Sequence, residues 1–227
     1  MENAVLLQDV KVSVPSPSEG NLEILSLEKL CIATNESVVI SGPSGVGKST
    51  TLNVICGLQR VTSGSCTVLG ERIDTLSESK RDAFRADKIG VVFQSFNLLP
   101  SLTTIENILL AMMIGKKNVD KEKALDLLAQ VGLENRANHY PSTLSIGERQ
   151  RVAVARALAH CPKLIIADEP TGALDRQRAI EVMDILLSAA KMNDCTLIVV
   201  THDLSFTDKF DRHLQLSDLN KAGEAGK

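Results

Sequence analysis

Short runs of consecutive apolar residues recur along the chain, and stretches with helical periodicity separate most of them. The runs lie at 38–40, 68–69, 90–93, 164–167 and 197–200, and helices are predicted at 48–58, 81–86, 103–114, 121–130 and 180–190. Strands that are apolar on both faces are typical of parallel sheets covered by helices. The pattern therefore predicts an α/β fold with a mostly parallel sheet.

The N-terminal part of the chain has a different pattern. Apolar and polar residues alternate over 5–14 and 22–32, which predicts two half-buried strands separated by a loop at 15–20. Residues 95–159 contain no apolar run of the strand type, and we predict that they form a helical insertion. The small and polar residues after Ser217 are expected to fray.

Composition narrows the class of protein without identifying it. The 227 residues are 44% hydrophobic and carry a net charge of −3, so a substantial core is possible and the charge gives no argument for nucleic acid as a partner. Five scattered cysteines without a C-x-x-C pair favour reduced thiols over disulfides or a zinc site. No apolar run approaches the ~18 residues that span a membrane, and the first eight residues do not resemble a signal peptide. We therefore expect a cytosolic protein, unless a partner holds it at a membrane.

The first chemical motif lies between the apolar run 38–40 and a predicted helix. It fits the pattern G-x-x-x-x-G-K-[ST]. Glycines allow a tight loop whose amides turn towards phosphate oxygens, and the following helix adds its positive N-terminal end. Lys48 is predicted to reach the β- and γ-phosphates, Ser49 to bind Mg²⁺ and Thr50 to touch the α-phosphate. The predicted nucleotide-binding residues are Gly42, Pro43, Ser44, Gly45, Val46, Gly47, Lys48, Ser49 and Thr50.

Polar residues also follow three other apolar runs, where ligands of open α/β sheets bind. Asp168 and Glu169 follow 164–167, Gln94 follows 90–93, and His202 closely follows 197–200. We predict that Asp168 holds Mg²⁺, that Glu169 polarises the attacking water, that Gln94 reaches Mg²⁺ or water, and that His202 contacts the γ-phosphate. Each has a plainer alternative: a solvated strand end for the carboxylates, a loop-opening polar residue for Gln94, and a structural histidine for His202. The other histidines lack such placement and are assigned no role.

A second predicted anion site begins at Ser145. Ser145 and Glu148 have the S-x-x-E spacing of a capping box, which marks the start of a helix. This structural interpretation does not exclude function, because a capped helix start with Gly147 in its first turn also presents amides to an anion.

These motifs together resemble the ATP-binding subunits of ABC transporters over nearly the whole chain. Residues 42–50 resemble the Walker A motif, Gln94 the Q-loop, 144–148 the signature, 164–169 Walker B, 173–175 the D-loop and His202 the switch histidine, in the family's order. The resemblance implies a RecA-like P-loop NTPase fold with an N-terminal antiparallel β subdomain and an inserted helical subdomain. It predicts one domain over 1–220, with a core at 1–94 and 160–217, a helical subdomain at 95–159 and a flexible tail at 218–227.

The resemblance also implies an ATPase that works as a head-to-tail homodimer with two ATP molecules between the subunits. Ser145 and Gly147 of one chain would grip the γ-phosphate bound to the other, with Glu148 in the same motif and Asp175 near both sites. The stretches 93–100 and 168–175 are similar to the lipoprotein-releasing, macrolide-export and cell-division branch. The predicted partner is therefore a membrane permease of the FtsX/MacB type, which would hold the subunit on the inner face of the membrane. An alternative is a signalling ATPase that activates an extracytoplasmic partner without moving cargo.

Two features depart from the family pattern. Ile146 stands where a glycine is usual, and a β-branched residue is unsuited to positive φ. No aromatic residue precedes Phe84, so Val12, Val14 or Pro15 is expected to cover the adenine.

Residues 98–99 and 112–114 are either core of the helical insertion or a groove for a permease helix, and the sequence leaves both interpretations open.

Overall fold

The computed structural model describes residues 2–16 and 20–222 and divides into two compact units. The first unit is Met1–Asp82 with Val200–Lys227, and the second is Ala83–Val199. Helix α2 (Glu78–Lys88) begins in the first unit and ends in the second, because the boundary falls between Asp82 and Ala83. The predicted domain limits remain predictions.

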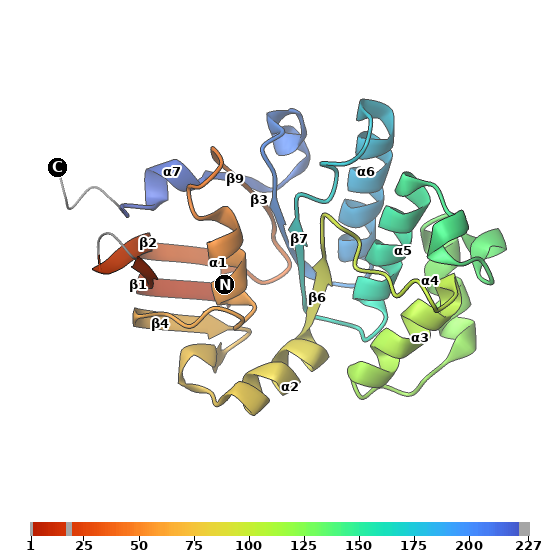
Figure 1. The fold of residues 1–227 in the computed structure, drawn as a ribbon, viewed down its shortest axis with the longest axis horizontal. Coiled ribbons are helices and arrows are strands. Elements are labelled where there is room, and N and C mark those ends of the chain that lie inside the picture. Colours follow the sequence, from red (N-terminus) through yellow and green to blue (C-terminus); the bar gives the residue numbers. More distant parts are fainter. Residues whose placement is uncertain (1, 17–19, 223–227) are drawn as a thin grey trace. The chain divides into compact units, whose positions relative to one another are not determined.

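The first unit contains an antiparallel sheet in which β2, β1 and β4 lie side by side (Figure 1), and β5 pairs with β4 at the edge. Its strands are β1 (Asn3–Ser16), β2 (Gly20–Ala33), β4 (Ser63–Val68) and β5 (Glu71–Arg72). Alternation along β1 buries Val5, Leu7, Val10 and Val12 completely, which explains why the sequence pattern located this strand.

The same unit contains a parallel pair of strands beside the phosphate-loop sequence. Strand β3 (Ser37–Ser41) pairs with β9 (Arg212–Gln215), and Ser41 lies opposite Gln215. Helix α1 (Lys48–Ile55) follows β3. The unit also includes η1 (Ile73–Thr75), η4 (Leu204–Lys209) and the short helix α7 (Leu216–Leu219).

The second unit combines parallel strands with helices. Strands β6 (Ile89–Val92), β7 (Leu164–Asp168) and β8 (Thr196–Val200) follow one another in the sheet, and β8 ends at the unit boundary. The helices are α3 (Thr104–Ile114), α4 (Lys121–Gln130), η2 (Glu134–Arg136), η3 (Pro141–Thr143), α5 (Ile146–Leu158) and α6 (Arg176–Met192). Residues 95–159, all of them described, contain helices and no strand.

Helix α5 packs against β6, and Gly90 permits this close approach. A Cβ atom at Gly90 would lie 2.3 Å from the carbonyl oxygen of Ala157, a distance that a side chain cannot occupy. Gly90 therefore sets the spacing between the strand and the C-terminal end of α5.

The predicted fold class is confirmed: a parallel sheet, an antiparallel N-terminal sheet and a helical segment are all present. One local prediction was wrong. Pro15 and Gly20 belong to the paired strands β1 and β2 instead of a loop, while residues 17–19 lie outside the described part. Residues 218–222 belong to or follow α7, and the amides of Asn220 and Lys221 donate hydrogen bonds; residues 223–227 lie outside the described part, and the flexible tail stays a prediction. Within residues 2–16 and 20–222, no helix combines the length and apolarity needed to cross a membrane.

Candidate nucleotide-binding site

The predicted phosphate loop connects β3 to α1 in the first unit. Gly42, Gly45 and Gly47 have φ values of 154°, 83° and 97°, which residues with a Cβ atom rarely adopt. A Cβ at Gly42 would also lie 2.8 Å from Val46 Cγ1. The loop therefore folds back on itself in a way that depends on glycine at these positions.

The loop leaves a set of backbone donors available for a ligand. Val46 N donates to Pro43 O at 3.4 Å and Thr51 N to Gly47 O at 2.8 Å. The other amides between Pro43 and Thr51 donate no hydrogen bond within residues 2–16 and 20–222; they belong to Ser44, Gly45, Gly47, Lys48, Ser49 and Thr50. Six such amides in a glycine loop at a helix N-terminus suit an anion such as a nucleotide phosphate.

The side chains of the loop add a cation and a hydroxyl. Lys48 Nζ donates to Gly42 O at 2.8 Å and to Pro43 O at 3.0 Å, so the ammonium group lies over the loop carbonyls. Ser49 is exposed at the start of α1. Both groups can therefore be reached by a ligand that approaches the loop.

His202 lies near this loop in the same unit. Thr201 N donates to Ile40 O at 3.1 Å, which joins the residue before His202 to the end of β3. The His202 side chain is exposed. The structure thus brings His202 to the end of β3 from which the phosphate loop departs.

In the second unit the structure brings Gln94, Asp168 and Glu169 together. Val92 of β6 pairs with Ala167 of β7, so Gln94 and Glu169 both lie two residues beyond this pair. Gln94 Nε2 is 3.1 Å from the position of a Cβ at Gly172, whose amide donates to Glu169 O at 3.1 Å. Glu169 has a φ of 46°, a left-handed conformation that costs roughly 1 kcal/mol or more in a residue other than glycine.

The loop that follows Gln94 is held by two side chains, Arg156 and Asn107, whose role no sequence motif indicates. Phe96 and Asn97 are both left-handed, with φ values of 62° and 50°. The Arg156 guanidinium from α5 donates to Phe96 O at 2.8 Å and also to Asn97 O. Burial lowers the pKa of Arg156. The buried Asn107 side chain accepts from Leu99 N at 2.8 Å, so the loop is fastened at both ends.

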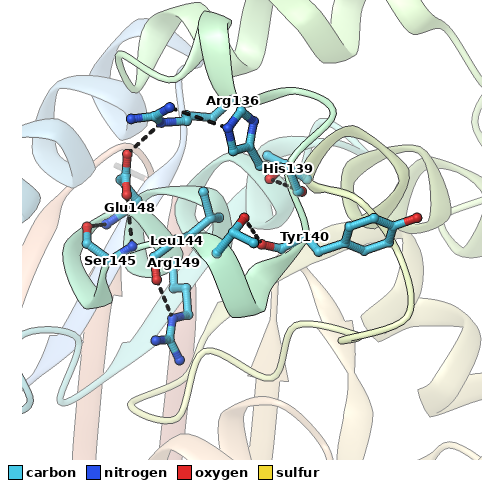
Figure 2. Close-up of polar contacts among 9 residues, drawn as sticks. Arg136, His139, Tyr140, Leu144, Ser145, Glu148 and Arg149 are labelled. Atoms are coloured by element: carbon cyan, nitrogen blue, oxygen red, sulfur yellow. Dashed lines mark hydrogen bonds and ion pairs between the residues drawn. The ribbon is translucent and has the colours of Figure 1, made fainter.

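The capping box predicted at Ser145 is present (Figure 2). Glu148 N donates to Ser145 Oγ at 3.2 Å, and Ser145 N donates to Glu148 Oε2 at 2.8 Å. Arg136 Nε donates to Glu148 Oε1 at 2.9 Å. These contacts, the Ser145 amide first, lower the pKa of Glu148 to about 2.

The backbone of Ile146, at the start of α5, does not adopt the positive φ that a β-branched residue would disfavour. Ile146 is the first helical residue and is absent from the residues with positive φ, so its β-branched side chain causes no backbone strain. The Ile146 side chain is 42% exposed, so it is not buried among apolar residues. The amides of Ile146 and Gly147 donate no hydrogen bond within the described ranges 2–16 and 20–222.

Asp175 begins the neighbouring helix α6. Its Oδ1 accepts from Arg178 N at 3.0 Å and its Oδ2 lies 3.4 Å from Arg178 Nε. Arg178 Cδ is 3.6 Å from the position of a Cβ at Gly147. The D-loop residue and the signature helix are therefore linked through Arg178.

A glycine loop with open amides, set between a parallel strand and a helix, defines a nucleotide-binding protein of the P-loop class. A family model described as "ABC transporter" matches residues 26–172, and the chain belongs to this family. It is 44% identical over 189 residues to the lipoprotein-releasing system ATP-binding protein LolD of Xanthomonas oryzae pv. oryzae, which covers 82% of this chain and 78% of the relative. It is 46% identical over 185 residues to an uncharacterized ABC transporter ATP-binding protein of Mycobacterium tuberculosis, covering 80% of this chain and 74% of that protein.

Solved structures agree with these relatives. The dimeric ATP-binding cassette MJ0796 in a post-hydrolysis state with ADP and Pi has a TM-score of 0.83 and 37% identity, covering 93% of this chain and 94% of that one. The chain is therefore an ATP-binding subunit of an ABC transporter and an ATPase. The alternative of a signalling ATPase that moves no cargo is not favoured.

Proposed function

We propose that residues 42–50 enclose the phosphates of ATP and that the polar residues after the parallel strands carry out hydrolysis. Lys48 neutralises the β- and γ-phosphates, and His202 contacts the γ-phosphate. Glu169 accepts a proton from the attacking water, which makes the water a better nucleophile. The observation that carries this proposal is the set of open amides in the glycine loop, because backbone N–H groups that converge at a helix N-terminus bind phosphate oxygens favourably.

Mg²⁺ is the second expected ligand, and the chemistry of the donors fits it. The Ser49 hydroxyl, the Gln94 amide oxygen and the Asp168 carboxylate are hard oxygen donors of the kind that Mg²⁺ prefers. When bound, the ion would neutralise charge on the β- and γ-phosphate oxygens. In this proposal the two neighbouring acids have separate roles: Asp168 holds the ion and Glu169 acts on the attacking water.

The active assembly is proposed to be a head-to-tail homodimer. Supporting this are the dimeric relative MJ0796 and the exposed start of α5 at Ser145 and Ile146, where the Ile146 amide donates no hydrogen bond to another described residue; Gly147 itself is buried. Ser145 and Gly147 would donate to the γ-phosphate bound by the partner subunit, while Glu148 keeps the helix start capped. Asp175 would lie at the subunit interface, where closure of the dimer would change its ion pair with Arg178.

The partner of this dimer is proposed to be an integral membrane permease of the FtsX/MacB type. The similarity to a lipoprotein-releasing ATP-binding protein supports this choice. The subunit would then work in the cytoplasm, on the inner face of the membrane, and ATP-driven closure would move the permease. By similarity to the lipoprotein-releasing relative, the cargo would be a lipoprotein.

Glu169→Gln tests the mechanism. We expect turnover to fall at least ~100-fold, because the proton acceptor is lost while phosphate binding is retained. ATP should then accumulate in a stable dimer, measured by size-exclusion chromatography with light scattering. Glu122→Gln, an exposed carboxylate of α4, is the matched control and should behave as wild type. A Glu169→Gln protein that stays monomeric with full turnover contradicts the assignment.

A further inference from the structure

The C-terminal segment after α7 contacts the phosphate loop through one side chain, Asn220. Asn220 Nδ2 donates to Val46 O at 2.9 Å and to Ile24 O at 3.3 Å. Its Oδ1 accepts from Ser26 N at 2.7 Å and from Ala222 N at 3.1 Å. Backbone amides only donate and carbonyls only accept, so the four contacts fix the orientation of this side-chain amide.

The contact with Val46 has a consequence for the neighbouring amide. The peptide bond between Val46 and Gly47 is trans, since the described residues contain no cis peptide. In a trans peptide the C=O and N–H groups point in opposite directions. A Val46 carbonyl held towards Asn220 therefore directs the Gly47 N–H away from Asn220, and this N–H is one of the open amides of the loop.

The packing around Gly47 supports the same conclusion. A Cβ at Gly47 would lie 3.2 Å from each of Asn220 Nδ2, Ile24 O and Leu25 Cδ1. One side of the Gly47 backbone is thus closed by Asn220 and β2. The peptide plane has little freedom to rotate while this contact persists.

We propose that Asn220 is a positioning residue for nucleotide binding: by holding the Val46 carbonyl, it aims the Gly47 amide at a phosphate of the bound nucleotide. The inference rests on the proposed phosphate-binding role of residues 42–50. It gives the segment after α7 a part in the ATP site, which its small and polar sequence does not suggest.

Asn220→Asp is the sharpest substitution. It keeps an acceptor for Ser26 N and Ala222 N, removes the donor to Val46 O, and places a carboxylate against that carbonyl. Asn220→Ala removes the contact without adding charge. The matched control is Asn193→Asp, because Asn193 Nδ2 also donates to a backbone carbonyl, Ala189 O at 2.8 Å, at the end of α6.

The measurements are dissociation constants for ATP and ADP and the inhibition constant of tripolyphosphate, taken at a temperature where each variant is folded. We expect Asn220→Asp to weaken all three by about tenfold and Asn220→Ala by about threefold, since one aligned phosphate contact is lost. Asn193→Asp should leave them unchanged. Tripolyphosphate has no base or ribose, so an equal loss for it locates the effect at the phosphates.

Two results overturn the inference. One is binding within twofold of wild type in both Asn220 variants. The other is weaker ATP binding with unchanged tripolyphosphate inhibition, which would assign Asn220 to support of β2 instead of the loop. If the wild-type protein binds ATP but tripolyphosphate does not compete, the proposed role of residues 42–50 fails instead.

Discussion

Replacing Glu148 should reveal how strongly the start of the signature helix is held. The carboxylate accepts from the Ser145 amide and from Arg136, and its pKa falls from 4.5 to about 2. Taken alone, this shift corresponds to ~3 kcal/mol of stabilisation. The Glu148 side chain is 18% exposed and that of Arg136 46%, so solvent screening reduces the expected loss in Glu148→Ala to roughly 1–2 kcal/mol.

The pH dependence follows from the direction of the shift. Because the folded pKa is depressed, the stabilisation is fully present above the unfolded pKa near 4.5 and is lost as the pH falls towards 2. At pH 4 the unfolded carboxyl is mostly protonated and the folded one is not, which removes ~0.8 kcal/mol. The destabilisation caused by Glu148→Ala should therefore be ~0.8 kcal/mol smaller at pH 4 than at pH 7.

Urea unfolding of wild-type and variant proteins at both pH values measures this difference. Glu148→Gln serves as the control, because an amide oxygen still accepts from Ser145 N while the charge opposite Arg136 is lost; it should cost less than half as much as Glu148→Ala. A Glu148→Ala effect that is equal at the two pH values, or a glutamine variant as unstable as the alanine variant, contradicts the assigned contacts.

Three further predictions concern activity. Arg156→Lys should lower ATPase turnover several-fold while ATP affinity changes little, because one ammonium cannot hold both the Phe96 and Asn97 carbonyls. Arg151→Lys on the same helix is the control. If the losses of Arg156→Lys and Gln94→Ala add in a double variant, Arg156 does not act through Gln94. Ile146→Gly should raise turnover in the assembled complex by removing an exposed side chain beside the open amides, and unchanged or lower turnover counts against this. The protein should discriminate poorly between ATP and GTP in competition binding, since β1 offers no aromatic side chain for stacking; a strong ATP preference refutes this.

Periodicity and short motifs were enough to locate most of the fold. Fully apolar runs identified β3, β6, β7 and β8, because strands buried on both faces have no polar positions. Strand β9 was missed, because its residues alternate between half-buried and exposed and include Arg212, His213 and Gln215. Val12 was proposed to cover the adenine, but the structure buries it completely, which leaves Val14 and Pro15 as candidates.

The motifs located the residues proposed to contact the ligand more readily than the residues that hold those segments in place. A capping box is local, so Ser145 and Glu148 could be paired from their spacing. Arg156 and Asn220 act across 59 and 174 residues of sequence, on carbonyls of Asn97 and Val46 respectively. Backbone carbonyls carry no sequence signal, and such contacts emerge only when the chain is folded.

Gly90 also has a mechanical consequence. The glycine holds the C-terminal end of α5 against β6, while the signature amides lie at the other end of the helix. Thirteen residues at 1.5 Å each make α5 a rigid arm ~20 Å long. If α5 tilted as a rigid body by ~5° about its contact with Gly90, its N-terminal end would move by ~2 Å, which exceeds the range of distances over which a hydrogen bond forms. A small tilt at Gly90 would therefore produce a larger displacement at Ser145 and Gly147, the residues proposed to contact the second nucleotide.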